Sequence, residues 1–405
     1  MAGNTPGTPS VLRAMNDRAA LDLLLEHGPL SRTRIGKLTG LSKPTASQLL
    51  ARLEAAGLVV ATGTAAGRPG PNAQLYAVNA SAAHVAGLDV NAHRIVAAVA
   101  DVTGETVGEF ELRTPGRRAD SVVREVTEAL DGAVAAAGLT RADVHRVVIG
   151  TPGAFDPNTG RLRYASHLPG WHSSTLLDEL AAVLPMPVEY ENDVNLVAVA
   201  EQRRGAARGH DDFVLLWNEE GLGAALVING RLHRGFTGGA GEVGFLPVPG
   251  APLVRQVTKA NAGGFQELAG AQVLARLARE LGIEDAPGSG THHAIAAELV
   301  GRAVEAVERG EAEPYATLLD QFATGLATGL ASLVAVLDPE IVVLSGELFS
   351  RGGEQLRARV AAELAELAAS RPRLLAGDVT HRPVLRGALE SALATTRDEV
   401  FDTSR

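Results

Sequence analysis

The first sixty residues place apolar side chains at helical spacing, divided by turn signals. Residues 16–27 carry apolar side chains at positions 20, 21, 24 and 25, which predicts a first helix closed by Gly28-Pro29. A short second helix is interrupted at Gly40, and Ser42 can cap a third helix by accepting a backbone N–H. The positions of the third helix predicted to face inward are Ala46, Leu49, Leu50 and Leu53.

Two short strands are predicted after the third helix. Residues 58–62 and 74–78 form the pair, and the Gly/Pro-rich loop 63–72 between them carries one cation, Arg68. An arginine on a thin loop can enter a narrow minor groove, where the negative potential is strongest. The order of helices and hairpin predicts a winged helix-turn-helix. The alternative is a linker with an incidental arginine.

The outward face of the third helix is polar or cationic, which suits contacts to base edges and phosphates. The alternative is a small helical hairpin with a solvated polar face. We predict DNA binding because turn, cap, polar face and wing occur together. The predicted DNA-binding residues are Arg32, Lys43, Thr45, Ser47, Gln48, Arg52 and Arg68.

The chain beyond the junction at residues 79–83 alternates strands and helices in two similar halves. The predicted strands are three within 84–114, then 144–150, 188–190, a hairpin within 213–235, 341–344 and 378–383, and the last helix is 387–397. Two βββαβα halves predict two lobes with a cleft between them. The fold class is therefore α/β, with a winged helix-turn-helix domain at 1–80 and a two-lobed domain at 81–405.

Composition and charge narrow the functions that the chain can have. It has 405 residues and no cysteine, which excludes disulfides and thiolate metal sites. No uncharged apolar stretch reaches 18 residues, and residues 1–10 lack a signal-peptide pattern, so we expect a cytoplasmic protein without a membrane span. Residues 1–80 hold eight basic and four acidic side chains, a net +4 against −10 for the whole chain, which leaves −14 for the remainder. This asymmetry suits a protein that touches nucleic acid with its N-terminal part only.

Five motifs of the second domain, in this order, resemble those of the ROK family of repressors, open reading frames and sugar kinases. They are Gly87-Leu-Asp-Val90, Thr151-Pro-Gly-Ala-Phe-Asp-Pro157, Leu168-Pro-Gly-Trp171, Glu191-Asn-Asp193 and Gly238-Gly-Ala-Gly-Glu-Val-Gly244. The winged helix-turn-helix is typical of the family's repressor branch. The resemblance runs from about residue 16 to the C-terminus, and it implies an actin-like, sugar kinase/Hsp70-type fold for the two lobes.

The turns that hold the nucleotide in the family's kinases are altered here. The first phosphate turn, Asp-x-Gly-Gly-Thr-Lys in the kinases, is Asp89-Val-Asn-Ala-His-Arg94. Glu219 and Glu220 precede Gly221-Leu-Gly223, where a second glycine-rich turn should hold phosphates. A carboxylate and a phosphate about 4 Å apart repel each other by about 4 kcal/mol at an effective dielectric near 20. The adenosine-side turn is Ser345-Gly346-Glu347. We therefore predict no catalytic residues and no nucleotide cofactor.

The sugar-binding side of the family pattern is largely kept. The resemblance assigns ligand binding to Asn192, Asp193, Glu242 and Glu267, and Asp193 matches the base of the kinases. Carboxylates and amides suit a polyol, because each hydroxyl both donates and accepts. The alternatives are that Asp193 caps the following helix and that the two glutamates are solvated loop acids. His167, also a predicted ligand, stands where the family has asparagine.

The zinc ligands of the family are missing. Phe245 replaces the histidine, and Thr258, Ala260 and Phe265 replace the cysteines, so the sequence predicts no structural zinc.

These features together predict a homodimeric or tetrameric regulator of carbohydrate genes, most simply a repressor. Its partners would be a palindromic operator in double-stranded DNA and a sugar or sugar derivative bound in the cleft. Two alternatives remain. One is a sugar kinase that also binds DNA, and the other is a regulator with a vestigial cleft that responds to a partner protein.

Overall fold

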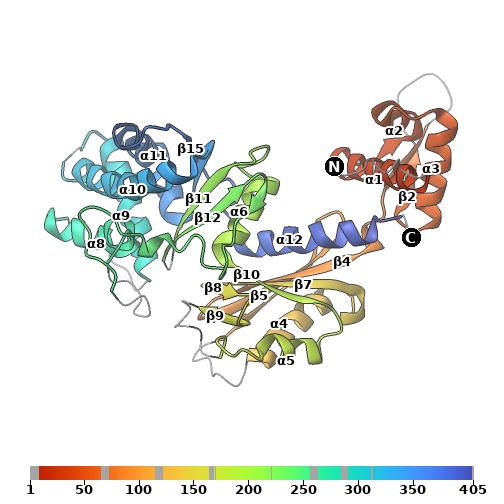
Figure 1. Ribbon diagram of the computed structural model, residues 1–405, viewed down its shortest axis with the longest axis horizontal. Helices are drawn as coiled ribbons and strands as arrows, with labels where there is room; N and C mark the ends of the chain where they lie inside the picture. The colour runs from red at the N-terminus through yellow and green to blue at the C-terminus, as the bar shows by residue number, and fades with distance from the viewer. Residues whose placement is uncertain are drawn as a thin grey trace, which may run out of the picture.

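The protein consists of a small N-terminal head and a larger body of two lobes (Figure 1). The computed structural model describes residues 9–64, 73–114, 122–163, 168, 170–219, 221–255, 263–283, 291–311 and 313–403. Separate clusters of buried apolar side chains form the cores of the head and of each lobe, and a further cluster lies between the lobes.

The head folds as the sequence predicts for a winged helix-turn-helix. Its elements are α1 (Pro9–His27), β1 (Leu30–Ser31), α2 (Arg32–Thr39), α3 (Lys43–Ala55), β2 (Val59–Thr64) and β3 (Gln74–Val78), with strand order β1-β3-β2. Gly40 ends α2 in the left-handed region with φ 71°, and Ser42 caps α3 by accepting from the backbone N–H of Thr45 at 3.3 Å. The first helix begins at Pro9, seven residues before the predicted start.

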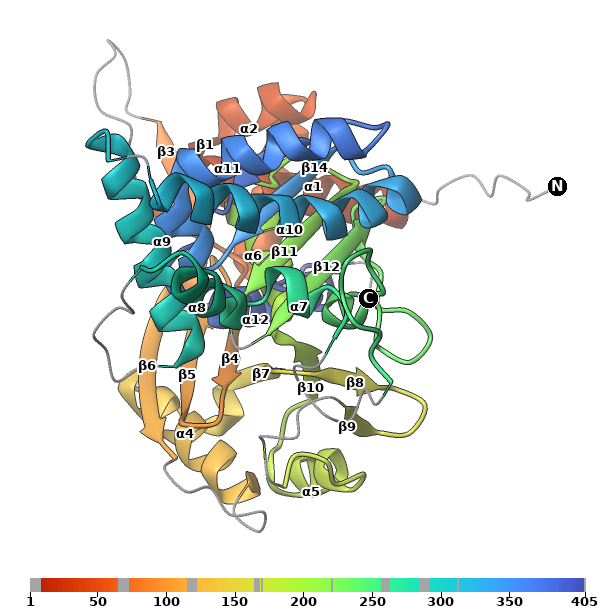
Figure 2. The same cartoon turned by 90° about the vertical axis from the view of Figure 1, so that its left-hand side faces the viewer.

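Lobe 1 contains a mixed five-stranded sheet in the order β10-β7-β4-β5-β6. Its elements are η1 (Ala80–Ala82), β4 (His84–Val90), β5 (Arg94–Asp101), β6 (Thr106–Arg113), α4 (Val122–Ala136), η2 (Arg141–Asp143), β7 (Val144–Thr151), β8 (Ala154–Asp156), β9 (Arg161–Arg163), α5 (Leu176–Val183) and β10 (Val188–Asn192). Helices α4 and α5 cover the outer face of the sheet (Figure 2).

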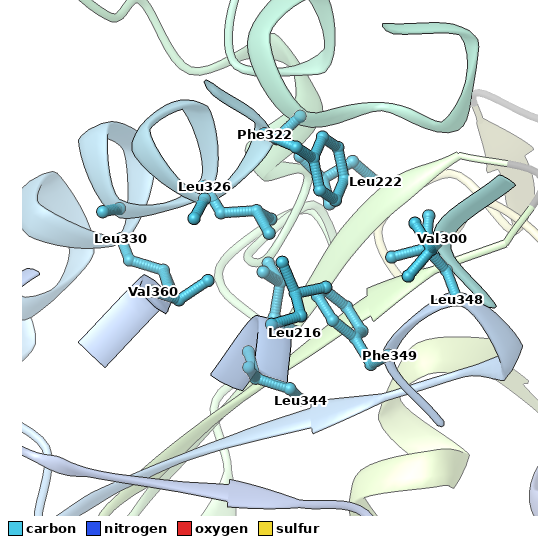
Figure 3. Packing of buried hydrophobic residues seen from close by; sticks show 14 of the residues in the cluster. Leu216, Leu222, Val300, Phe322, Leu326, Leu330, Leu344, Leu348, Phe349 and Val360 are labelled. Atoms are coloured by element: carbon cyan, nitrogen blue, oxygen red, sulfur yellow. The ribbon is translucent and has the colours of Figure 1, made fainter. Parts of the chain in front are cut away.

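Lobe 2 repeats this plan with strand order β13-β12-β11-β14-β15. Its elements are β11 (Phe213–Asn218), β12 (Leu222–Ile228), β13 (Arg231–Leu232), η3 (Val243–Phe245), α7 (Gln266–Ala269), α8 (Ala271–Glu280), α9 (His292–Glu308), α10 (Tyr315–Leu337), β14 (Ile341–Ser345), α11 (Glu347–Leu367) and β15 (Arg373–Ala376). Within the described residues α10 alone is long and apolar enough to cross a membrane. Its Phe322 and Leu326 are fully buried against the sheet and α11, so it serves as a core helix (Figure 3).

Helices α6 (Asp193–Arg204) and α12 (Pro383–Val400) lie between the two sheets. They cross so closely that a Cβ on Gly387 would overlap the carbonyl oxygen of Leu196. In Figure 1, α12 runs from the region between the lobes to the head. The body and head therefore share this helix.

The structure corrects the sequence prediction near the C-terminus. The predicted strand at 378–383 is wrong, because β15 lies at Arg373–Ala376, where Leu374 pairs in register with Val342 and enters the core. The final helix starts at Pro383, four residues before the predicted start, since proline suits the first turn of a helix. The short β8-β9 hairpin was not predicted.

Candidate effector cavity and DNA-binding face

A cavity of about 800 Å³ opens between the lobes. The lining comes from the ends of β4 and β10, the start of α6, the turn between β11 and β12, the loop before η3, and the start of α12. Three of the predicted ligand residues, Asn192, Asp193 and Glu242, are brought together in this lining. His167 lies outside the described residues.

Asn192 and Asp193 stand at the start of α6, where they have different roles. Asn192 is the N-cap: its side-chain oxygen accepts from the backbone N–H of Asn195 at 3.2 Å. Its amide also donates to the carbonyl of Gly153 at 3.0 Å, which fixes the side chain. Asp193 is the first residue of the helix, and its Oδ1 accepts from the backbone N–H of Val194 at 2.8 Å. A negative charge here is favoured by the helix dipole.

Glu242 enters the cavity from the glycine-rich loop that precedes η3. The loop lies against β12, since a Cβ on Gly241, whose φ is 98°, would overlap the carbonyl oxygen of Ala224. Burial raises the pKa of Glu242 from 4.5 to about 7. A hydroxyl-bearing ligand would therefore meet a carboxyl group that readily exists in both donor and acceptor forms near neutral pH.

Glu267 is placed outside the described lining of the cavity. Its carboxylate accepts from Nη1 of Arg276 at 3.3 Å, and the neighbouring Gln266 lines the cavity instead. The oxygen of Gln266 accepts from the backbone N–H of Leu222 at 2.7 Å. The lining residue is Gln266 rather than the predicted Glu267 because both belong to α7, where successive side chains point in different directions.

The cavity is also lined by two arginines and a histidine that the sequence did not indicate. Arg94 follows β4 in the chain, whereas His381 and Arg382 precede α12. Arg382 adopts a left-handed conformation, with φ 49°, and pairs with Glu109 and Glu111 of β6. These residues come from opposite ends of the body sequence, so only the fold brings them together.

The carboxylate of Glu219, which lines the cavity from the turn between β11 and β12, lies at the start of α11. Oε1 of Glu219 accepts from the backbone N–H of Glu347, the first residue of α11, at 3.3 Å. A helix N-terminus is a favourable place for an anion such as a phosphate. Here the carboxylate of Glu219 takes that position. Glu220 lies outside the described residues.

The residues aligned with the family's zinc site have different surroundings. Phe265 is fully buried beside Gly329 in the core of lobe 2, whereas Phe245 lines the cavity. Thr258 and Ala260 lie outside the described residues. In the described ranges, no three His, Asp or Glu side chains are grouped as metal ligands would be.

The predicted DNA-binding residues of the head lie on or beside α3. Lys43, Thr45, Gln48 and Arg52 are exposed, and Nη1 of Arg32 donates to Oγ of Ser47 at 3.1 Å. The hydroxyl of Thr45 lies 2.8 Å from Oγ of the cap residue Ser42. Arg68, on the wing loop, lies outside the described residues.

Arg52 differs from the other residues of this face. Its Nη2 donates to Oδ1 of Asp17 on α1 at 2.6 Å, and the Asp17 side chain is only 3% exposed. Arg52 thus bonds to α1 within the head, while 43% of its side chain remains exposed.

A winged-helix head on a two-lobed α/β body with an interlobe cavity defines a DNA-binding regulator built on a sugar-kinase-like fold. The ROK family model matches residues 85–394, and the MarR family model matches residues 16–68. The chain therefore belongs to the ROK family, and it is a DNA-binding transcriptional regulator of that family.

Relatives of two kinds are similar to the chain. The xylose repressor of Caldicellulosiruptor bescii is 27% identical over 353 residues, which cover 85% of this chain and 87% of the repressor. The glucokinase of Halalkalibacterium halodurans is 28% identical over 281 residues, which cover 67% of this chain and 82% of the enzyme. A solved ROK family transcriptional regulator, described as a homolog of the E. coli MLC protein, shares the fold with a TM-score of 0.74 and 19% identity, over 97% of this chain and 98% of its own.

Gln48 is the residue of α3 whose replacement best tests base reading. It is exposed near the middle of the helix, and its amide can bond two groups of an adenine edge. We expect Gln48→Ala to weaken operator binding by about 1–3 kcal/mol and to relax sequence preference at the base that it contacts. Gel-shift titration at fixed salt against single-base operator variants measures both effects. Equal loss on every variant would contradict base reading.

The raised pKa of Glu242 predicts a pH-dependent stability. Between pH 4.5 and about 7 the carboxyl is ionised in the unfolded chain but retains its proton in the folded protein. The free energy of unfolding should therefore fall as pH rises through this window. We expect Glu242→Gln to remove this loss. The free energy of unfolding of the variant should rise relative to that of the wild type between pH 4.5 and about 7, and the difference should stay constant above pH 7. Urea denaturation across this range measures the difference, and a pH-independent difference would contradict the burial effect.

Proposed function

We propose that the protein is a repressor whose operator affinity is controlled by a sugar or sugar derivative bound in the interlobe cavity. The observation that carries this proposal is the asymmetry of the cavity. Asp193 and Glu242 place carboxyl groups suited to a polyol in the lining, whereas the carboxylate of Glu219 bonds to the helix terminus that would attract a phosphate. Such a site can bind a sugar without transferring a phosphoryl group to it.

Helix α12 supports a route from the cavity to the head. Pro383 and Val384 at its start line the cavity, and Phe401, directly after its end, is buried among the apolar residues of the head. The helix has 18 residues and so spans about 27 Å. A ligand that binds one arrangement of the lobes more tightly would shift the position of this helix, and with it the head.

Contacts between the lobes at the cavity edge could respond to the ligand. Nε of Arg234, after β13 in lobe 2, donates to Oε2 of Glu191 in lobe 1 at 2.6 Å. Glu191 directly precedes Asn192 and Asp193. A ligand held by these residues therefore acts beside an ion pair that joins the lobes.

The ligand class follows from the names of relatives together with the cavity. One relative is a xylose repressor and another a glucokinase, and both names specify an unmodified monosaccharide. We infer that the effector belongs to this class or its simple derivatives. We further propose a cytoplasmic homodimer or tetramer that binds an inverted repeat, since two-fold oligomers present two heads to one duplex.

The effector proposal predicts a separation between operator binding and sugar response. Asp193→Ala and Glu242→Ala should leave operator affinity nearly intact, while each lost hydrogen bond to a charged group weakens sugar binding by about 1.5–3 kcal/mol, or roughly tenfold to a hundredfold. The measurement is operator release against concentration of xylose, glucose and N-acetylglucosamine.

Glu267→Ala serves as the matched control, because its carboxylate pairs with Arg276 outside the described lining. It should respond like the wild type. Release curves that are unchanged in Asp193→Ala and Glu242→Ala would show that the signal acts elsewhere, as expected for the alternative of a partner protein.

The occupied helix terminus predicts that the protein has no sugar kinase activity. Glu219 would repel the phosphates of ATP at the start of α11. We expect no ADP release with hexoses, pentoses or amino sugars in a coupled assay. Turnover that disappears in Asp193→Asn would establish the alternative of a DNA-binding kinase.

A further inference from the structure

The C-terminal residues form part of the core of the DNA-binding head. Phe401 is 1% exposed and lies in one apolar cluster with Leu21 of α1 and Leu53 of α3. The guanidinium of Arg18, on α1, lies 5.8 Å from the centre of the Phe401 ring and pairs with Asp398 at 2.7 Å. The head is therefore built from both ends of the chain, as Figure 1 shows.

Asp17 is the point at which three segments of the head meet. Its Oδ1 accepts from Nη2 of Arg52 on α3 at 2.6 Å, and its Oδ2 accepts from Oγ1 of Thr403 at 3.1 Å. Both oxygens of a nearly buried carboxylate are thus bonded, one to the helix that faces DNA and the other to the segment after α12. A buried charge is strongly destabilising unless it is paired and hydrogen-bonded, so these contacts restrict the geometry of the site.

We propose that Asp17 is a positioning residue for DNA recognition, which holds α3 in a fixed orientation relative to the C-terminal segment. Arg52 is the residue through which α3 is attached, and we call the contacts among Arg52, Asp17 and Thr403 the clamp. The carboxylate does not face DNA; it fixes the helix that presents Lys43 and Gln48. Because the C-terminal segment continues α12, the clamp is also the place where α12 is attached to the recognition helix.

The substitution Asp17→Asn distinguishes this proposal from the interpretation that Arg52 contacts a DNA phosphate. The two predict opposite changes in operator affinity. If Arg52 chiefly binds phosphate, Asp17→Asn frees its charge, strengthens operator binding and steepens the salt dependence by about one phosphate contact. If Asp17 positions α3, the same change weakens binding, because a neutral amide holds the guanidinium less firmly. The charge that Asp17 loses should by itself favour DNA, so a weaker complex cannot arise from net charge.

The experiment measures operator affinity of the full-length protein over a range of salt concentrations, with a duplex selected by the wild type from a random pool. We expect Asp17→Asn to weaken binding roughly tenfold and Thr403→Val about threefold, with a salt slope no steeper than that of the wild type. Thr403→Ser, which keeps the hydroxyl, should bind with wild-type affinity. Circular dichroism at the assay temperature confirms that each variant is folded.

Asp22→Asn is the matched control, because Asp22 lies on the same helix and pairs with Arg18 at the surface, at 2.9 Å. Because it loses the same charge without touching Arg52 or Thr403, it should bind operator as tightly as the wild type or slightly more tightly. Unchanged or tighter binding by Asp17→Asn would overturn the proposal. Equal affinities of Thr403→Val and the wild type would show that the C-terminal segment does not help to position α3. The Thr403→Val measurement remains decisive even if Asp17→Asn does not fold.

Discussion

The close crossing of α12 over α6 is the constraint on which the rest of the structure depends. Gly387 has no side chain at the point where the backbone of α12 meets Leu196, so the two helices can lie together between the sheets. Polar contacts then fix α12 along its length: Glu390 binds Arg204 of α6, Nε of Arg397 donates to the carbonyl of Val102, and Glu399 binds Arg146 of β7. These contacts fix the C-terminal half of α12 against α6 and lobe 1.

Local signals made the head the more predictable part of the chain. Gly40 and Ser42 each determine a turn or a cap through their own backbone chemistry, and the structure has both where the sequence places them. The pairing of Arg52 with Asp17 was not predictable in this way, because the partners are 35 residues apart in sequence and meet only through the packing of α1 on α3. Surface polarity alone cannot distinguish a DNA contact from an anchor.

The cavity was predictable where one motif supplies several residues and unpredictable where distant segments meet. Asn192 and Asp193 are adjacent at a helix start, and the resemblance to a family located them together with Glu242. His381 and Arg382 carry no motif; they reach the cavity because β15 ends at Ala376 and the chain turns into α12. The resemblance assigned Glu267, whereas the structure places the neighbouring Gln266 in the lining, and a motif alone does not show which residue of a short helix faces a cavity.

A cavity that binds without catalysis needs only a difference in affinity between two lobe arrangements. Moving an equilibrium from about 1:99 to 99:1 requires roughly 5.5 kcal/mol of differential binding, which a few charged hydrogen bonds to one sugar can supply. Catalysis would require more: room and positive potential for a nucleotide's phosphates. Glu219 at the start of α11 provides the opposite potential while stabilising that helix. The same carboxylate therefore stabilises the start of α11 and opposes the binding of a phosphate there.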